Sequence, residues 1–319
     1  MLDILLLLMA AIWGTNYSIV KSVFREIDPQ AFNAMRMLVA SVAFLVVLGL
    51  VRVLRRQSPG LATRRDLPRG GIASVFHTPT PLTRRDWLAL AALGLVGHVL
   101  YQYFFIGGLS RTSVANSSLT LAATPVVIAL LSALLGHERV GPAHWLGAAV
   151  SAGGIYLVVG RGMAIGGPGV VGDLMMLAAV CCWAVYTLGA RPLMTRHSPA
   201  AVTGLSMALG TLVYVPAAWP NVRGVDWTSV SGWTLFLLVY SALFALCVSY
   251  TIWYIAVRQI GSARTSAYSN LVPIVAMTSA VIFLDEPLGW RKILGAVAVL
   301  AGVALTRAAG QRIPIPAEE

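Results

Sequence analysis

Ten long apolar segments recur along this chain, and they constrain its fold more than any other feature. Each is about 20 residues long, the length at which an α-helix crosses the hydrocarbon core of a bilayer. Only 11% of the residues are charged, against about 25% in a soluble domain. We therefore expect an all-α polytopic membrane protein with the bilayer as its partner. The expected spans are 2–22, 30–51, 87–109, 113–135, 141–160, 170–190, 199–218, 231–257, 263–284 and 288–308.

Most connections between the expected spans are very short, so consecutive helices should be antiparallel neighbours. The exception is the stretch 52–86, which holds eight arginines and four prolines and which we interpret as a solvated basic loop. With the N terminus inside, the inner connections and the C-terminal tail carry 15 Lys or Arg residues, and the outer connections carry seven. Since cytoplasmic loops are rich in basic residues, both termini are expected on the cytoplasmic side of a bacterial inner membrane. The eight arginines of the loop 52–86 account for this entire difference in basic residues between the two sides.

The net charge of +11 is also found in proteins that bind nucleic acid, but no compact basic domain is present to grip a phosphate backbone. We therefore expect no nucleic-acid partner. Cys181, Cys182 and Cys247 lie within apolar spans without metal-ligand spacing, so no metal is expected. The run from Leu2 has no basic region before it and continues past Trp13, which argues against a cleavable signal peptide.

The sequence repeats itself in two registers. The series Ala115, Pro125, Glu138, Gly147 and Gly154 recurs 148 residues later as Ala263, Pro273, Glu286, Gly295 and Gly302. The series Asp3, Trp13 and Lys21 recurs 170 residues later as Asp173, Trp183 and Arg191. Because each half has an odd number of expected spans, the halves must face opposite ways, as in many secondary transporters. The domain prediction is a first five-helix repeat at 1–160, a second at 161–308 and a cytoplasmic tail at 309–319.

The same residues resemble the drug/metabolite transporter superfamily, specifically its EamA-like exporters. The first span reads Trp13-Gly14-Thr15-Asn16-Tyr17 followed by Lys21, the second carries Ala34-Met35-Arg36-Met37-Leu38, and each half closes with the spaced Pro, Glu and Gly of the repeat. The resemblance covers nearly the whole chain except 52–86. It implies ten helices around a central cavity, and export of amino acids, related metabolites or drugs.

Polar and aromatic side chains form stripes at helical spacing on two spans. Trp13, Asn16 and Tyr17 share one side of the first span, and Trp183 and Tyr186 repeat the pattern on the sixth. An interfacial aromatic belt is the alternative, but both tryptophans are expected near mid-span. We favour a substrate-binding role for all five residues.

Further candidates lie on four other spans. His98 is expected near the centre of the third span with Tyr101 and Gln102 on its face, and it either faces a wet cavity or bonds to a neighbouring helix. Asn116 belongs to a small polar face on the fourth span, for which helix packing is an equal alternative. The eighth and ninth spans add Tyr250 and Tyr268.

Charged residues at span ends receive structural interpretations. Lys21 and Arg191 are expected to reach toward lipid headgroups. Glu138 and Glu286 precede the fifth and tenth spans, where the helix dipole favours an acid. Arg36, inside the second span, either attracts an anionic substrate group or holds backbone carbonyls, and the second alternative is preferred.

The function expected from these features is secondary transport of small metabolites, amino acids or related compounds, outward across the membrane. No P-loop, H-E-x-x-H or G-x-S-x-G motif and no mid-span carboxylate is present in the sequence. We therefore expect neither an enzyme nor a cofactor-dependent protein. Multidrug or cation efflux by the same fold is the first alternative, and a membrane-embedded enzyme is the second.

Overall fold

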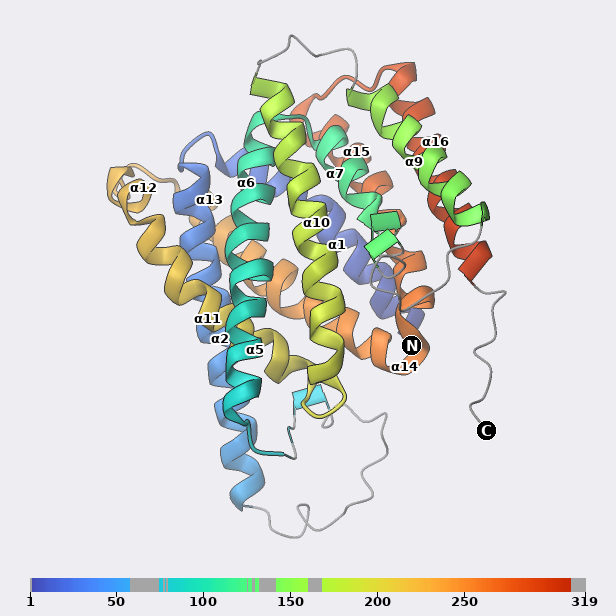
Figure 1. The fold of residues 1–319 in the computed structure, drawn as a ribbon. Coiled ribbons are helices and arrows are strands. Elements are labelled where there is room, and N and C mark those ends of the chain that lie inside the picture. Colours follow the sequence, from blue (N-terminus) through green and yellow to red (C-terminus); the bar gives the residue numbers. More distant parts are fainter. Residues whose placement is uncertain are drawn as a thin grey trace, which may run out of the picture.

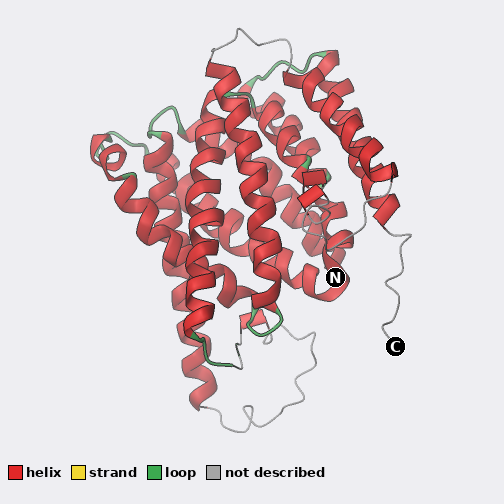
Figure 2. Cartoon of the chain, viewed as in Figure 1, coloured by secondary structure: helices red, strands yellow, loops and turns green. Residues whose placement is uncertain are grey.

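The computed structural model describes residues 2–57, 75–76, 78, 80–124, 126–127, 130–131, 142–159 and 168–310. Within these ranges the regular secondary structure is helical throughout (Figure 2). Six helices or helical runs are long and apolar enough to cross a membrane, as expected for a polytopic membrane protein. They are Leu2–Val23, Pro29–Leu54, Arg84–Arg111, Gly169–Met194, Pro199–Ala217 and Gly232–Ala256.

The helices pack side by side in one bundle (Figure 1). In chain order they are α1 (Leu2–Val23), α2 (Pro29–Gln57), α5 (Arg84–Gly94), η1 (Leu95–Leu100), α6 (Tyr101–Arg111), α7 (Val114–Ala122), α9 (Pro142–Val159), α10 (Pro168–Met194), α11 (Pro199–Ala217), α12 (Trp219–Gly224), α13 (Gly232–Tyr240), η2 (Ser241–Val248), α14 (Ser249–Ser269), α15 (Leu271–Leu284) and α16 (Trp290–Gly310). Most of the expected loop 52–86, the tail after Gly310 and Glu138 lie outside the described residues.

The boundary between the expected eighth and ninth spans is displaced. We predicted a connection at 258–262, but α14 continues to Ser269 and the chain turns at Asn270. Pro273, the third residue of α15, fits the position of the break, because proline lacks an N–H and is accommodated without a lost hydrogen bond in the first turn of a helix. The expected fourth span is interrupted in the same way: α7 ends at Ala122 and Ala123 forms a turn, two positions before Pro125.

Two π-helical segments occupy the middle of the third and eighth spans. In η1 the N–H of Tyr101 bonds to the carbonyl of Val96, and in η2 the N–H of Ser249 bonds to that of Phe244, five residues back in each case. The two segments coincide at the repeat offset of 148 residues. Such wide turns are rare and occur frequently at functional sites, so both indicate a candidate functional site in the region between them.

Helices α9 and α16 pack closely through glycines. A methyl group added at Gly154 would lie 2.8 Å from the carbonyl oxygen of Gly295, and one added at Gly302 would lie 2.5 Å from that of Gly147. Each residue of one contact is the repeat counterpart of a residue of the other. The contact is therefore reciprocal, and the order of its residues makes the two helices antiparallel. Small residues at such positions let helix backbones approach within a membrane.

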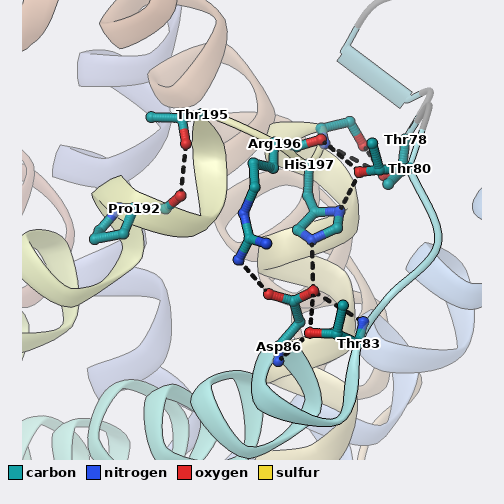
Figure 3. A network of polar contacts seen from close by, with 9 residues as sticks. Thr78, Thr80, Thr83, Asp86, Pro192, Thr195, Arg196 and His197 are labelled. Carbon is teal, nitrogen blue, oxygen red and sulfur yellow. Dashed lines mark hydrogen bonds and ion pairs between the residues drawn. The ribbon is translucent and has the colours of Figure 1, made fainter.

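A polar network joins the start of α5 to the connection between α10 and α11 (Figure 3). Asp86, which is 1% exposed, accepts from the guanidinium of Arg196 at 2.5 Å and lies 3.3 Å from Nε2 of His197. The same carboxylate accepts from the backbone N–H of Thr83 at 2.9 Å and completes a capping box with its hydroxyl. Thr80 adds a bond to the carbonyl of Arg196.

A second network joins the connection after α1 to the start of α13. The carboxylate of Glu26 accepts from the backbone N–H of Ser231 at 2.8 Å and from its hydroxyl at 3.0 Å. Ser231 caps α13 just as Thr83 caps α5, 148 residues earlier. The starts of α5 and α13 lie at opposite ends of the bundle (Figure 1), so each end carries one such network between helices of different halves.

Candidate functional site

Aromatic side chains from four spans meet in the interior of the bundle, and we call these nine residues the aromatic cluster. The Trp183 ring stacks on Tyr250 at 5.5 Å between centroids and 17° between planes, and it also contacts Tyr101 at 5.1 Å and Tyr186 at 5.6 Å. The cluster consists of Trp13, Tyr17, His98, Tyr101, Phe105, Trp183, Tyr186, Tyr250 and Trp253, each in ring contact with at least one other member. Seven of the predicted site residues are therefore neighbours.

The π-helical segments position two members of this cluster. Trp13 donates its indole N–H to the carbonyl of Ala245 in η2 at 3.0 Å. His98, fully buried on η1, lies 3.3 Å from the hydroxyl of Ser206 and contacts the Tyr186 ring at 5.1 Å. His98 therefore bonds to a neighbouring helix, as one of the two interpretations from sequence expected, and its ring belongs to the aromatic cluster.

A chain of polar side chains borders the aromatic cluster and connects four helices. Arg36 on α2 donates to Oδ1 of Asn33 at 2.7 Å, to Oε1 of Gln102 at 2.8 Å and to Oγ of Ser241 at 3.3 Å. Ser241 in turn donates to Oδ1 of Asn16 at 2.7 Å. We call these five residues the arginine network. It includes two predicted site residues, Asn16 and Gln102, whose sequence neighbours Tyr17 and Tyr101 belong to the aromatic cluster.

Arg36 has partners that differ from those we expected from the sequence. It is 1% exposed, and its described bonds go to side-chain oxygens rather than to the backbone carbonyls we had preferred. Its guanidinium also lies over the Phe32 ring at 5.4 Å. The signal was present in the sequence, since an ionisable side chain inside a span is a functional-site hypothesis by default.

Asn116 lies apart from this centre, contrary to its predicted grouping with His98. Its side chain donates to Thr112 at 3.2 Å and toward Asp173 at 3.5 Å. Thr112 follows α6, about 16 Å along the helix from Tyr101 at 1.5 Å per residue. Asn116 therefore belongs to a polar group where α6, α7 and α10 meet.

Tyr268 also lies outside the aromatic cluster. Its hydroxyl donates to the carboxylate of Asp3 at 2.5 Å. Asp3 precedes Trp13 by ten residues on α1, about 15 Å along the helix. Because α14 continues to Ser269, Tyr268 lies far along this helix from Tyr250 rather than beside it on the next span.

Two charged residues at span ends have protein partners that differ from those expected. Lys21 donates to the carbonyls of Leu109 and Thr112 at the end of α6, where a cation is favoured by the helix dipole. Glu286 accepts from the backbone N–H of Val114 at 2.9 Å and so caps α7, not the helix that follows it in sequence. Among the described residues, no group of three His, Cys, Asp or Glu side chains has the arrangement of a metal site.

Comparison with known proteins decides the family. A model of the EamA-like transporter family matches residues 1–160 and, a second time, residues 170–308. The chain is a member of this family. The resemblance drawn from Trp13, Lys21, Arg36 and the repeated Pro, Glu and Gly is thereby confirmed, and this EamA-like protein is a transporter that spans a membrane several times.

Two relatives match more than nine-tenths of the EamA-like chain. An uncharacterized transporter of Archaeoglobus fulgidus is 26% identical over 307 residues, 96% of each chain. A probable terminal-alkyne amino-acid exporter of Streptantibioticus cattleyicolor is 25% identical over 302 residues, 94% of this chain and 91% of that one. A solved crystal structure shares the fold with a TM-score of 0.62 at 18% identity, covering 97% of both chains.

Proposed function

We propose that this EamA-like protein exports amino acids or related small metabolites across the bacterial inner membrane by alternating access. The observation that carries the proposal is the aromatic cluster beside the arginine network, both in the interior of the bundle. Small-molecule sites combine apolar and aromatic walls with a few placed polar groups, and these two groups of residues supply both.

The architecture we propose is ten spans in two inverted five-helix repeats, 1–160 and 161–308, around a central cavity, with both termini and 52–86 in the cytoplasm. The double family match, the reciprocal contact of Gly154 and Gly302, and the paired π-helical segments support it. In this arrangement Trp13 and Trp183, which are repeat counterparts, contact Tyr250 from opposite halves.

Alternating access requires that the two ends of the bundle open in turn. The networks of Asp86 with Arg196 and of Glu26 with Ser231 join helices of different halves at opposite ends. We propose that each network closes its own end and breaks when that end opens. Both consist of a few polar contacts, so either can exchange its protein partners for water.

The substrate class follows from the chemistry of the centre. Aromatic faces such as Trp183 and Tyr250 pack against apolar side chains and attract an ammonium group by cation–π contact. An amino acid with a sizeable apolar side chain offers both features. The probable amino-acid exporter among the relatives supports this class. Multidrug or cation efflux is the second candidate, because the same aromatic faces also suit a hydrophobic cation.

Purified protein in liposomes tests the proposal. Vesicles loaded with unlabelled L-phenylalanine should accumulate radiolabelled L-phenylalanine by counterflow, and unlabelled L-leucine outside should compete. Protein-free vesicles are the control. Counterflow of tetraphenylphosphonium without counterflow of any amino acid would favour the second candidate, and no counterflow of either would contradict both.

A further inference from the structure

We propose that Arg36 is the carboxylate anchor of the transport site, an inference that rests on the proposed export of amino acids. The ligand class is a carboxylate whose apolar portion packs on the aromatic cluster.

The charge of Arg36 is solvated by neutral groups. Asn33, Gln102 and Ser241 offer amide and hydroxyl oxygens at 2.7, 2.8 and 3.3 Å. Both ion pairs among the described residues involve Asp86 at one end of the bundle. The neutral oxygens orient the guanidinium without cancelling its charge, and a charge within a membrane span is costly. An arriving carboxylate would supply the missing opposite charge.

The guanidinium also has donor capacity to spare. It carries five N–H donors, and the described structure assigns three hydrogen bonds to them. Its Nε is buried without a hydrogen-bond partner. Arginine binds carboxylates through paired N–H donors more strongly than it binds neutral acceptors. A ligand carboxylate would therefore add bonds or displace the amide of Gln102.

The position of Arg36 links the charge to the aromatic cluster. Gln102 directly follows Tyr101, which contacts Trp183 at 5.1 Å. Asn16, the far end of the arginine network, lies three residues after Trp13 on the same helix. Arg36 also interacts electrostatically with the hydroxyls of Tyr250 and Tyr101, so a molecule with its carboxylate at Arg36 would place its remaining atoms beside Trp183 and Tyr250. This geometry favours amino acids and aryl carboxylates over amines without an acid group.

Three probes of similar shape separate the contributions. L-phenylalanine carries both charged groups, 3-phenylpropionate only the carboxylate, and phenethylamine only the ammonium. Binding to purified protein is measured through tryptophan fluorescence, independently of transport. We expect both carboxylates to bind, and phenethylamine to bind about thirtyfold more weakly than L-phenylalanine, since losing a buried charge partner costs at least about 2 kcal/mol.

Two variants carry the test. Arg36→Met should lose binding of both carboxylates. Gln102→Glu keeps the side-chain shape and places a carboxylate where the amide lies 2.8 Å from the guanidinium, so it should block carboxylates even if Arg36→Met does not fold. Arg223→Gln, which changes the same charge at an exposed position on α12, should bind all three probes as wild type does.

The outcomes are distinct for the anchor and for the proposed function. The anchor is overturned if Gln102→Glu binds 3-phenylpropionate as tightly as wild type does. It is also overturned if wild type binds phenethylamine as tightly as L-phenylalanine. Failure of both carboxylates to bind wild type overturns it too. Amino-acid counterflow unchanged in Arg36→Met would reject the anchor and leave the proposed function in place. Transport of 3-phenylpropionate without any amino acid would reject the proposed substrate and support the anchor.

Discussion

Trp13 and Ala245 are 232 positions apart in sequence, yet the indole N–H of the first donates to the backbone carbonyl of the second at 3.0 Å. Ala245 lies in η2, and the bond ties the first helix of the chain to a π-helical turn of the eighth expected span. The bond also holds Trp13 against Tyr250 and Trp253. The aromatic cluster is therefore anchored to the backbone as well as packed.

Replacing Trp183 with alanine should reduce transport far more than it reduces the amount of folded protein. The ring contacts Tyr101, Tyr186 and Tyr250, and the apparent affinity should fall at least about tenfold if about 1.4 kcal/mol of ligand contact is lost. The measurement is counterflow normalised to monodisperse protein. Trp233→Ala, at a residue 67% exposed, is the matched control, and equal transport by both variants would remove Trp183 from the site.

A cysteine at position 60 should react with an impermeant maleimide only after the cells are opened, because 52–86 carries the basic residues that favour the cytoplasm. A cysteine at position 223 should react in intact cells. The background protein has Cys181, Cys182 and Cys247 replaced by serine. Labelling of position 60 in intact cells would show that the orientation is opposite to the one we propose.

Gly154→Val should prevent α9 and α16 from packing, since even a methyl group at Gly154 would lie 2.8 Å from the carbonyl oxygen of Gly295. Gly153 has nothing within 4 Å of such a methyl group, so Gly153→Val has the same change in helix propensity without the clash. We expect a much lower yield and apparent Tm in detergent for the first variant alone. Similar losses in both variants would show that a branched side chain on this helix, and not the clash with α16, causes them.

Stability should depend on the ionisation of Glu26. Hydrogen bonds from the backbone N–H of Ser231 and from the Thr234 side chain lower the pKa of Glu26 from its ordinary value of 4.5. A depressed folded-state pKa stabilises the protein above the unfolded value, and this contribution is lost as the pH falls through the folded-state value. Wild type should therefore melt above Glu26→Gln at pH 7. The difference should disappear in acid, and a constant difference would refute the linkage.

The helical period alone predicted most members of the aromatic cluster. Stripes of Trp13 with Tyr17 and of Trp183 with Tyr186 identify helix faces without any knowledge of packing. The helical period does not predict how deep in the bundle a residue lies. Asn116 and Tyr268 are polar or aromatic residues of the expected kinds, but they pair with Asp173 and Asp3 near the ends of the bundle.

Partners across the fold were the least predictable part. Glu286 follows α15, yet it caps α7, a choice that depends on how the halves pack. Arg36 was correctly placed inside a span, but a single sequence does not reveal that Gln102 and Ser241 would meet it. The end of α14 was missed because we predicted a connection at 258–262, whereas the helix continues to Ser269 and the chain turns three residues before Pro273.

The reciprocal contact of α9 with α16 has a consequence for how such a chain can arise. Gly154 with Gly295 and Gly302 with Gly147 form an isologous interface, the type that a two-fold symmetric homodimer uses. Each half therefore carries a patch complementary to its own copy. In the inverted architecture that we propose, two copies of a half-length chain inserted in opposite orientations would meet through this patch, and fusion of two gene copies would fix one copy in each orientation.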